Sequence, residues 1–204
     1  ATLFGSRYVL FGAEKDPDNP TELELRRRKI VLAFGLDQAG YFPPGTFGAG
    51  TAKEAIEDAG CCQITLEFGG GTGWYKNGKD NVSDAERGIW NIMKSMRMME
   101  GDFESDGPLC TVYNAGIVIW KGDVDGLFIR QRRFGDEMKE GDVYASLVDA
   151  YTGETIDTMV APEDGIVIPS GKEWPTIGAT SVGILGNIDR VEDRRTADMY
   201  VDFD

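Results

Sequence analysis

The chain has 204 residues and contains no histidine. Histidine is the commonest metal ligand and the usual general base near neutral pH. This chain alone therefore cannot build a histidine-based zinc site or a serine–histidine–aspartate triad. Any metal chemistry must use its carboxylates and thiols, or ligands from another polypeptide.

Long apolar runs and basic residues are also scarce. No stretch of 18 consecutive apolar residues occurs, so the sequence predicts no membrane span, and its first residues do not resemble a signal peptide. Lysine and arginine number 21 against 35 aspartates and glutamates, which gives a net charge of −14. Such an acidic protein repels nucleic acids and anionic membranes, so we expect neither as a partner.

Cysteine is the third scarce residue type, with only three in the chain. Cys61 and Cys62 are adjacent and Cys110 is distant, which is a poor disulfide framework. Their apolar surroundings predict that Cys61 and Cys62 lie in a strand as buried free thiols, and hence that the protein is cytoplasmic. Adjacent residues of a strand point to opposite sides, so this pair cannot easily share a metal ion.

The first half of the chain alternates strand-like and helix-like segments. Arg7–Phe11 predicts a short strand. Capping-box patterns at Thr21–Glu24 and Thr51–Glu54 predict two helix starts, and Gly35 and Gly60 are the expected ends of those helices. Such alternation is typical of an α/β layer.

A third capping-box pattern, Ser83–Glu86, predicts the start of another helix. Its apolar residues recur at helical spacing, and we expect them to form core rather than a binding surface. These residues are Ile89, Trp90, Met93, Met96 and Met99.

The second half reads as short strands separated by turn signals, which favours a small all-β unit. We place the boundary so that residues 1–107 form an α/β domain and residues 108–204 a β-sandwich with an acidic tail, Asp189–Asp204, that is an edge strand or loose. Turns at Phe134–Val143 and Ala161–Val167 resemble those of lipoyl and biotinyl carrier domains. The expected hairpin tip, Tyr151–Glu154, has no modifiable lysine, so we expect a scaffold rather than a carrier. The predicted strands are Val112–Trp120, Gly126–Arg130, Val143–Val148, Thr155–Val160, Ile166–Pro169 and Ser181–Leu185.

One carboxylate stands out as a candidate catalytic group. A short β-rich run ends at Glu67, and after Phe68 a glycine stretch begins with Gly69 and Gly70. Ligands of open α/β sheets bind beyond the carboxyl ends of strands, and glycines let other groups approach closely. Trp74 and Tyr75 follow and either wall a substrate pocket or simply pack. The plainer alternative is a solvated glutamate before a flexible loop.

Several segments occur in the order found in one enzyme family. Gly45–Thr51, Ile64–Gly70 and Met138–Val143, followed by Ala161–Val167, resemble the succinylglutamate desuccinylase/aspartoacylase family of zinc carboxypeptidase-like deacylases. The resemblance runs from about Tyr8 to Leu185. It implies part of a carboxypeptidase-like α/β/α layer followed by the small carrier-like β-sandwich.

The resemblance also implies a reaction. Glu67 matches the family's general base, which takes a proton from a zinc-bound water as that water attacks the amide bond of an N-acyl amino acid or similar small molecule. The family's zinc ligands, a His-x-x-Glu pair and a later histidine, have no counterpart here, and neither do its substrate-binding arginines. Zinc is therefore expected in the complete enzyme but not on this chain alone.

Two interpretations remain open. We favour a carboxyl-terminal portion of a deacylase whose amino-terminal, zinc-binding half is a separate partner or was lost. The alternative is a non-catalytic binding or scaffold protein derived from the same family. A homo-oligomer is compatible with either, and the sequence does not identify the acyl group or the amine of the substrate.

Overall fold

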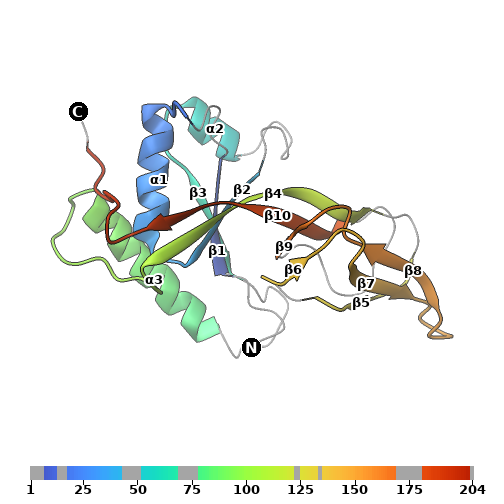
Figure 1. Ribbon diagram of the computed structural model, residues 1–204. Coiled ribbons are helices and arrows are strands. Elements are labelled where there is room, and N and C mark those ends of the chain that lie inside the picture. Colours follow the sequence, from blue (N-terminus) through green and yellow to red (C-terminus); the bar gives the residue numbers. More distant parts are fainter. Residues whose placement is uncertain are drawn as a thin grey trace. The chain divides into compact units, whose positions relative to one another are not determined.

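The computed structural model describes residues 7–12, 18–42, 52–68, 78–121, 125–132, 135–168 and 181–202. Its contacts divide the chain into an α/β unit, Thr2–Asn114 with Asp189–Asp204, and a strand unit, Ala115–Ile188. Figure 1 shows, in chain order, β1 (Arg7–Gly12), α1 (Glu22–Phe34), β2 (Gln38–Phe42), α2 (Ala52–Asp58), β3 (Ile64–Phe68), α3 (Gly78–Ser95), β4 (Leu109–Lys121), β5 (Leu127–Arg130), β6 (Glu137–Met138), β7 (Val143–Val148), β8 (Thr155–Val160), β9 (Gly165–Ile168) and β10 (Ser181–Asp193).

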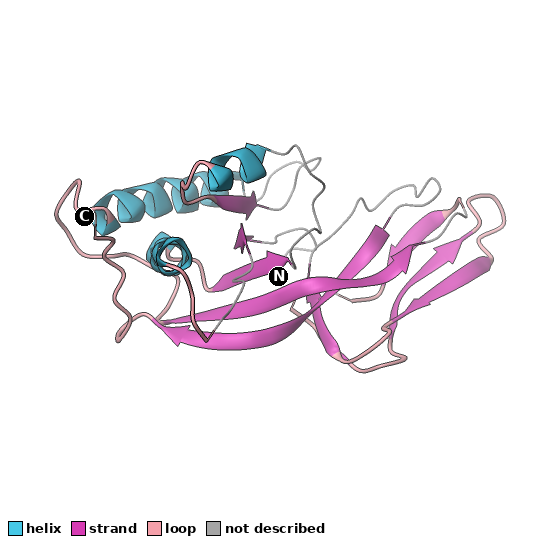
Figure 2. Ribbon diagram, turned by 90° about the horizontal axis from the view of Figure 1, so that it is seen from above, coloured by secondary structure: helices cyan, strands magenta, loops and turns pink. Residues whose placement is uncertain are grey.

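The described helices, drawn in cyan in Figure 2, all belong by sequence to the α/β unit. Its strands follow the order β3-β1-β2-β4 within the larger sheet. β1 and β2 are parallel, as are β2 and β4, whereas β3 is antiparallel to β1. The unit is therefore a mixed α/β layer, in agreement with the sequence prediction.

Helix α1 begins and ends where its sequence predicts. Thr21 is the N-cap, and its hydroxyl accepts a hydrogen bond from the backbone N–H of Glu24 (3.3 Å), while the Glu24 carboxylate accepts one from the N–H of Thr21 (2.7 Å). Gly35 ends the helix with φ of 96°, a conformation that glycine adopts without strain. Helix α2 likewise stops before Gly60, which has φ of 74°.

The core of the α/β unit lies between α1 and the strands. Val9 and Phe11 alternate along β1, and Phe34 near the end of α1 is fully buried beside them. The remaining buried members of this cluster are Val31, Leu32, Leu36, Ala39, Cys110 and Val112.

Helix α3 differs from its prediction in two ways. It begins at Gly78, so Ser83 lies inside the helix and the third capping box is wrong. Ile89 and Trp90 are 54% and 46% exposed, so the expectation that they form core is also wrong. The buried residues of the helix are small or polar: Asp84, Gly88, Asn91, Lys94 and Ser95.

The segment that follows β10 is anchored to the α/β unit rather than loose. β10 extends to Asp193, and the guanidinium of the buried Arg194 donates hydrogen bonds to the carbonyls of Leu32 (2.9 Å), Leu36, Gly107 (2.9 Å) and Leu109 (2.8 Å). The backbone N–H of Val201 donates to the carbonyl of Ser95 (2.8 Å). These bonds explain why Asp189–Asp204 groups with the α/β unit, where we had placed it with the strand unit.

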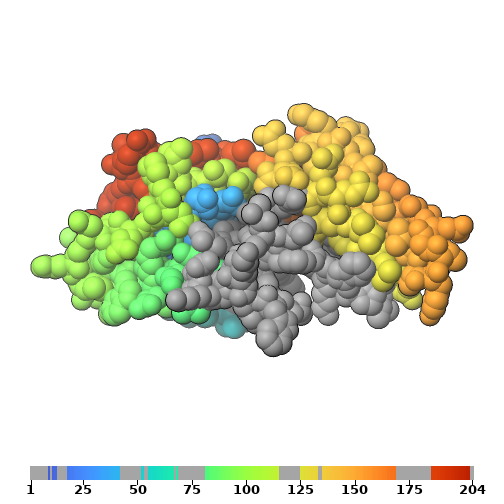
Figure 3. Space-filling view, turned by 90° about the horizontal axis from the view of Figure 1, so that it is seen from below, coloured from blue at the N-terminus to red at the C-terminus, as the bar shows by residue number. Residues whose placement is uncertain are grey.

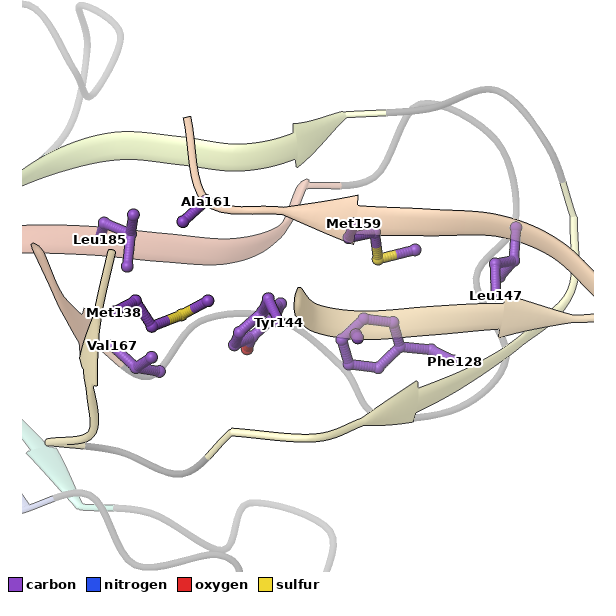
Figure 4. Packing of buried hydrophobic residues seen from close by; sticks show 9 residues of the cluster. Phe128, Met138, Tyr144, Leu147, Met159, Ala161, Val167 and Leu185 are labelled. Carbon is purple, nitrogen blue, oxygen red and sulfur yellow. The ribbon is translucent and has the colours of Figure 1, made fainter. Parts of the chain in front are cut away.

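The described elements of the strand unit are strands only. β7 and β8 have the predicted bounds, and β5, β7 and β8 form a three-stranded antiparallel sheet. Figure 4 shows the packing of its core cluster, in which the rings of Phe128 and Tyr144 lie 5.9 Å apart. The other members are Met138, Ala145, Leu147, Met159, Ala161, Val167 and Leu185.

The hairpin between β7 and β8 has a well-ordered tip. The Asp149 carboxylate accepts hydrogen bonds from the backbone N–H groups of Tyr151 and Thr152, both at 2.8 Å, and these bonds hold the pKa of Asp149 below its usual range. Tyr151 is 97% exposed. The likeness of this unit to lipoyl and biotinyl carriers stays a prediction.

Among the described helices of the chain, none is long and apolar enough to cross a membrane.

Candidate functional site

The backbone of Glu67 lies at the second-last position of β3. Tyr8 is its partner across the antiparallel pair, and Phe68 pairs with Arg7. The carboxyl end of β3 therefore lies beside the amino end of β1, and the carboxyl end of β1, at Gly12, lies at the opposite end of the strands. The sequence predicted Glu67 at the end where the parallel strands β1, β2 and β4 have their carboxyl ends. Because β3 is antiparallel to β1, Glu67 lies at the other end.

The local sequence explains how β3 is held. Ile64, Leu66 and Phe68 contact the core cluster of the α/β unit, which fixes the register of the strand against β1. In the alternation of residues along β3, the backbone position of Glu67 matches that of Thr65. Its side chain, like the whole of Gly69, Gly70, Trp74 and Tyr75, lies outside the described residues.

The described residues do not fit a zinc ion. In the parts of the chain that the structure describes, no three side chains of the His, Cys, Asp and Glu types are grouped closely enough to hold a metal. The sequence has no histidine to add to such a group. Metal ligands for the reaction implied by the family resemblance would therefore have to come from outside this described set.

The edge at the carboxyl end of β1 holds a cluster that the sequence reasoning missed. The buried Arg27 of α1 donates a hydrogen bond to the carbonyl of Gly12 (3.1 Å) and forms an ion pair with Glu57 of α2 (3.2 Å). Burial raises the pKa of the nearby Cys62 thiol, and the positive charge of Arg27 opposes that shift. The cluster joins β1, α1 and α2, so its evident role is structural. Arg27 sits in a run of three arginines, and nothing in that run marks one of them as buried.

The thiols differ from their predicted positions. Cys61 and Cys62 precede β3 instead of lying in a strand, and Cys61 is exposed. Cys110 is buried in the core, and burial raises its pKa to about 11. It is therefore protonated at neutral pH and unsuited to act as a nucleophile or metal ligand.

A shallow groove of about 270 Å³ runs along α3 and the segment after it. Its two cations are already engaged. Arg87 pairs with Asp106 (2.8 Å) and Asp84 (3.3 Å), and Lys94 donates to the carbonyl of Asp102 (2.7 Å). The groove therefore offers no uncommitted positive charge for a small ligand.

No protein-family model matches this sequence, and neither does any curated protein. Solved structures resemble its fold. A succinylglutamate desuccinylase from Silicibacter sp. TM1040 has a TM-score of 0.75 at 18% identity, and the match covers 91% of this chain and 54% of that protein. The apo structure of the ectoine utilization protein EutE from Ruegeria pomeroyi has a TM-score of 0.73 at 18% identity, with 90% and 56% covered.

A succinylglutamate desuccinylase/aspartoacylase from Rhodobacter sphaeroides gives a TM-score of 0.71 at 20% identity, with 92% of this chain and 56% of that one covered. These matches confirm the resemblance seen in the sequence. The chain thus spans little more than half the length of these structures. Over that length, its fold is that of the succinylglutamate desuccinylase/aspartoacylase family proteins.

Proposed function

We propose that this chain is part of a zinc-dependent deacylase that hydrolyses the amide bond of an N-acyl amino acid or a similar small molecule. The observation that carries the proposal is the fold match, which covers nine-tenths of this chain and includes proteins described as succinylglutamate desuccinylases. The position of Glu67 near the end of β3, one residue before a glycine stretch, supports its assignment as the general base.

Glu67 would act through its carboxylate. It would accept a proton from the attacking water and return it to the leaving amine, so its contribution is proton transfer at a fixed position. Gly69 and Gly70 would let the substrate approach that carboxylate, because a glycine has no side chain in the way. Trp74 and Tyr75 would form apolar walls of the substrate pocket.

The zinc implied by the family resemblance would be held by the part of the protein that this chain does not contain. That part would be an amino-terminal half, supplied as a partner polypeptide or as the rest of a longer chain. Metal analysis of the dialysed chain should then give well under one zinc per chain. Stoichiometric zinc held by ligands of this chain would contradict this assignment.

The strand unit would serve as a scaffold with the architecture of lipoyl and biotinyl carriers. It would carry no attached group, because the hairpin tip lacks a lysine. An intact mass equal to that of the sequence is expected, and an added cofactor mass would contradict it. The free thiols favour a cytoplasmic location.

The direct test is Glu67→Gln, which keeps the shape of the side chain but cannot accept a proton. The chain is joined by a flexible linker to the amino-terminal portion of the Silicibacter desuccinylase, and hydrolysis of N-acyl amino acids is followed. General-base catalysis contributes about 10²- to 10⁴-fold, so kcat should fall by that factor. If no complete form is ever active, the non-catalytic scaffold becomes the better description.

A further inference from the structure

Helix α3 turns an apolar stripe outward. Val82, Ile89 and Met93 lie on one side of the helix at spacings of seven and four residues. Trp90 flanks them, and Met96 follows directly after Ser95, the last residue of the helix. Val82 is 67% exposed, Ile89 54% and Trp90 46%, while Met93 and Met96 are half-buried. We call these five residues the α3 stripe. Atoms of α3 form part of the surface drawn in green in Figure 3.

The opposite face of α3 is the buried one, and its contacts explain why. Gly88 lies so close to Phe34 of α1 that an added Cβ would be 2.2 Å from the ring. The Asn91 amide donates to the carbonyl of Glu104 (2.5 Å) and accepts from the N–H of Glu104 (3.2 Å). Lys94 is held by the carbonyl of Asp102 (2.7 Å). Asn91 and Lys94 are therefore hydrogen-bonded within the chain, and the helix cannot turn its stripe inward without breaking these bonds.

A row of large apolar side chains at helical spacing differs from the single exposed apolar residues that are normal on a protein surface. An amphipathic helix ordinarily packs its apolar face against something. Contiguous exposed apolar patches mark interaction sites. Judged from the described residues, the α3 stripe is thus an exposed packing surface.

Two observations indicate what fills it. The first is that the similar structures are longer, and 44–46% of their length has no counterpart in this chain. The second is that β3 stands at the end of the strand order among the described residues, so a further polypeptide can extend this sheet beside β3. The same polypeptide is our candidate for covering the stripe. A second copy of this chain is disfavoured by its net charge of −14.

We infer that the α3 stripe is the docking surface for the remaining half of the deacylase. This inference rests on the function proposed above, because it takes the partner to be that half. The partner would present a complementary apolar helix face or sheet face, and burial of the stripe would hold the two halves together. Burying one isoleucine fully is worth about 10- to 100-fold in affinity.

The test measures how accessible the stripe is. Ile89→Cys is made in the full chain alone and in the chain linked to the amino-terminal portion of the Silicibacter desuccinylase, since a linker raises the effective concentration to about the millimolar range. Maleimide labelling is followed by peptide mass, which separates this site from the native thiols. Ile156→Cys on β8 is the matched control, because Ile156 is 43% exposed in the strand unit.

Labelling at Ile89→Cys should be at least about 10-fold slower in the linked protein than in the chain alone, with no change at Ile156→Cys. Equal rates at Ile89→Cys in the two proteins overturn the inference. It is also overturned if the chain alone is a dimer that Ile89→Asp converts to a monomer, since the occupant is then a second copy. Protection without deacylase activity would refute the proposed function and leave the docking surface standing. Deacylase activity without protection of Ile89→Cys would refute the docking surface and leave the proposed function standing.

Discussion

Replacing Gly88 with alanine tests which face of α3 packs inward. An alanine Cβ would lie 2.2 Å from Cε2 and 2.3 Å from Cζ of Phe34, whose side chain is fully buried. Carbon atoms in contact lie about 3.5–4.0 Å apart, so the overlap exceeds 1 Å and the two helices must separate or the ring must leave its position. Overpacking of this kind costs about 1–3 kcal/mol.

The opposing effect is helix propensity, since alanine is favoured over glycine inside a helix by about 0.5–1 kcal/mol. The clash should win, and Gly88→Ala should lower the free energy of unfolding by about 1–2 kcal/mol in urea titrations of the full chain. Val82→Ala on the exposed side of the same helix is the control and should stay within about 0.5 kcal/mol of the parent. If Gly88→Ala stabilises the protein by the propensity gain, Gly88 is not packed against α1 and the outward stripe is an error.

Three further outcomes are expected. Arg194→Lys keeps the charge but cannot reach four carbonyls, so urea unfolding should show a loss of about 2–4 kcal/mol, and a change below about 0.5 kcal/mol would refute the anchoring role. Thiol labelling of the native chain should modify Cys61 first, Cys62 more slowly and Cys110 only on unfolding, and early modification of Cys110 would contradict its burial. The pKa of Cys110 is raised from 9.0 to about 11, so the folded state holds that proton more tightly. The free energy of unfolding then keeps its full value below pH 9 and falls as pH rises to 11, by up to about 3 kcal/mol, and Cys110→Ala should flatten that fall.

Local signals predicted the parts of the fold that local interactions determine. Thr21 and Glu24 cap α1 and Gly35 ends it, because each acts through hydrogen bonds or backbone conformation within a few residues. The strands β7 and β8 were located to the residue, since turn residues bracket an alternating pattern on both sides.

The errors arise where tertiary contacts decide. Periodicity identified α3 as amphipathic, but it could not show that Gly88 permits a close helix crossing that leaves Ile89 and Trp90 outside. Composition predicted that Asp189–Asp204 is an edge strand or a loose tail, yet the buried side chain of Arg194 ties this segment to the core. The direction of β3 is likewise a property of the sheet, so the edge to which Glu67 belongs was not predictable from its own segment.

The candidate site was predicted to the extent that it is a matter of chain order. The resemblance identified the fold and singled out Glu67, and the structure determines the backbone position of that residue on β3. The remaining candidates, Gly69, Gly70, Trp74 and Tyr75, lie outside the described residues and stay predictions. Groups that would select the acyl part or the amine of the substrate were not predicted, because the sequence resemblance assigned none to this chain.

The central claim is that Glu67 transfers the proton in amide hydrolysis. The most direct measurement is kcat for an N-acyl amino acid in the linked protein, determined in parallel for Glu67→Gln and for Glu137→Gln, an exposed glutamate on β6 of the strand unit. We expect kcat to fall about 10²- to 10⁴-fold for Glu67→Gln, with KM nearly unchanged, and to stay at the parent value for Glu137→Gln. An active linked protein in which Glu67→Gln turns over as fast as Glu137→Gln would contradict the claim.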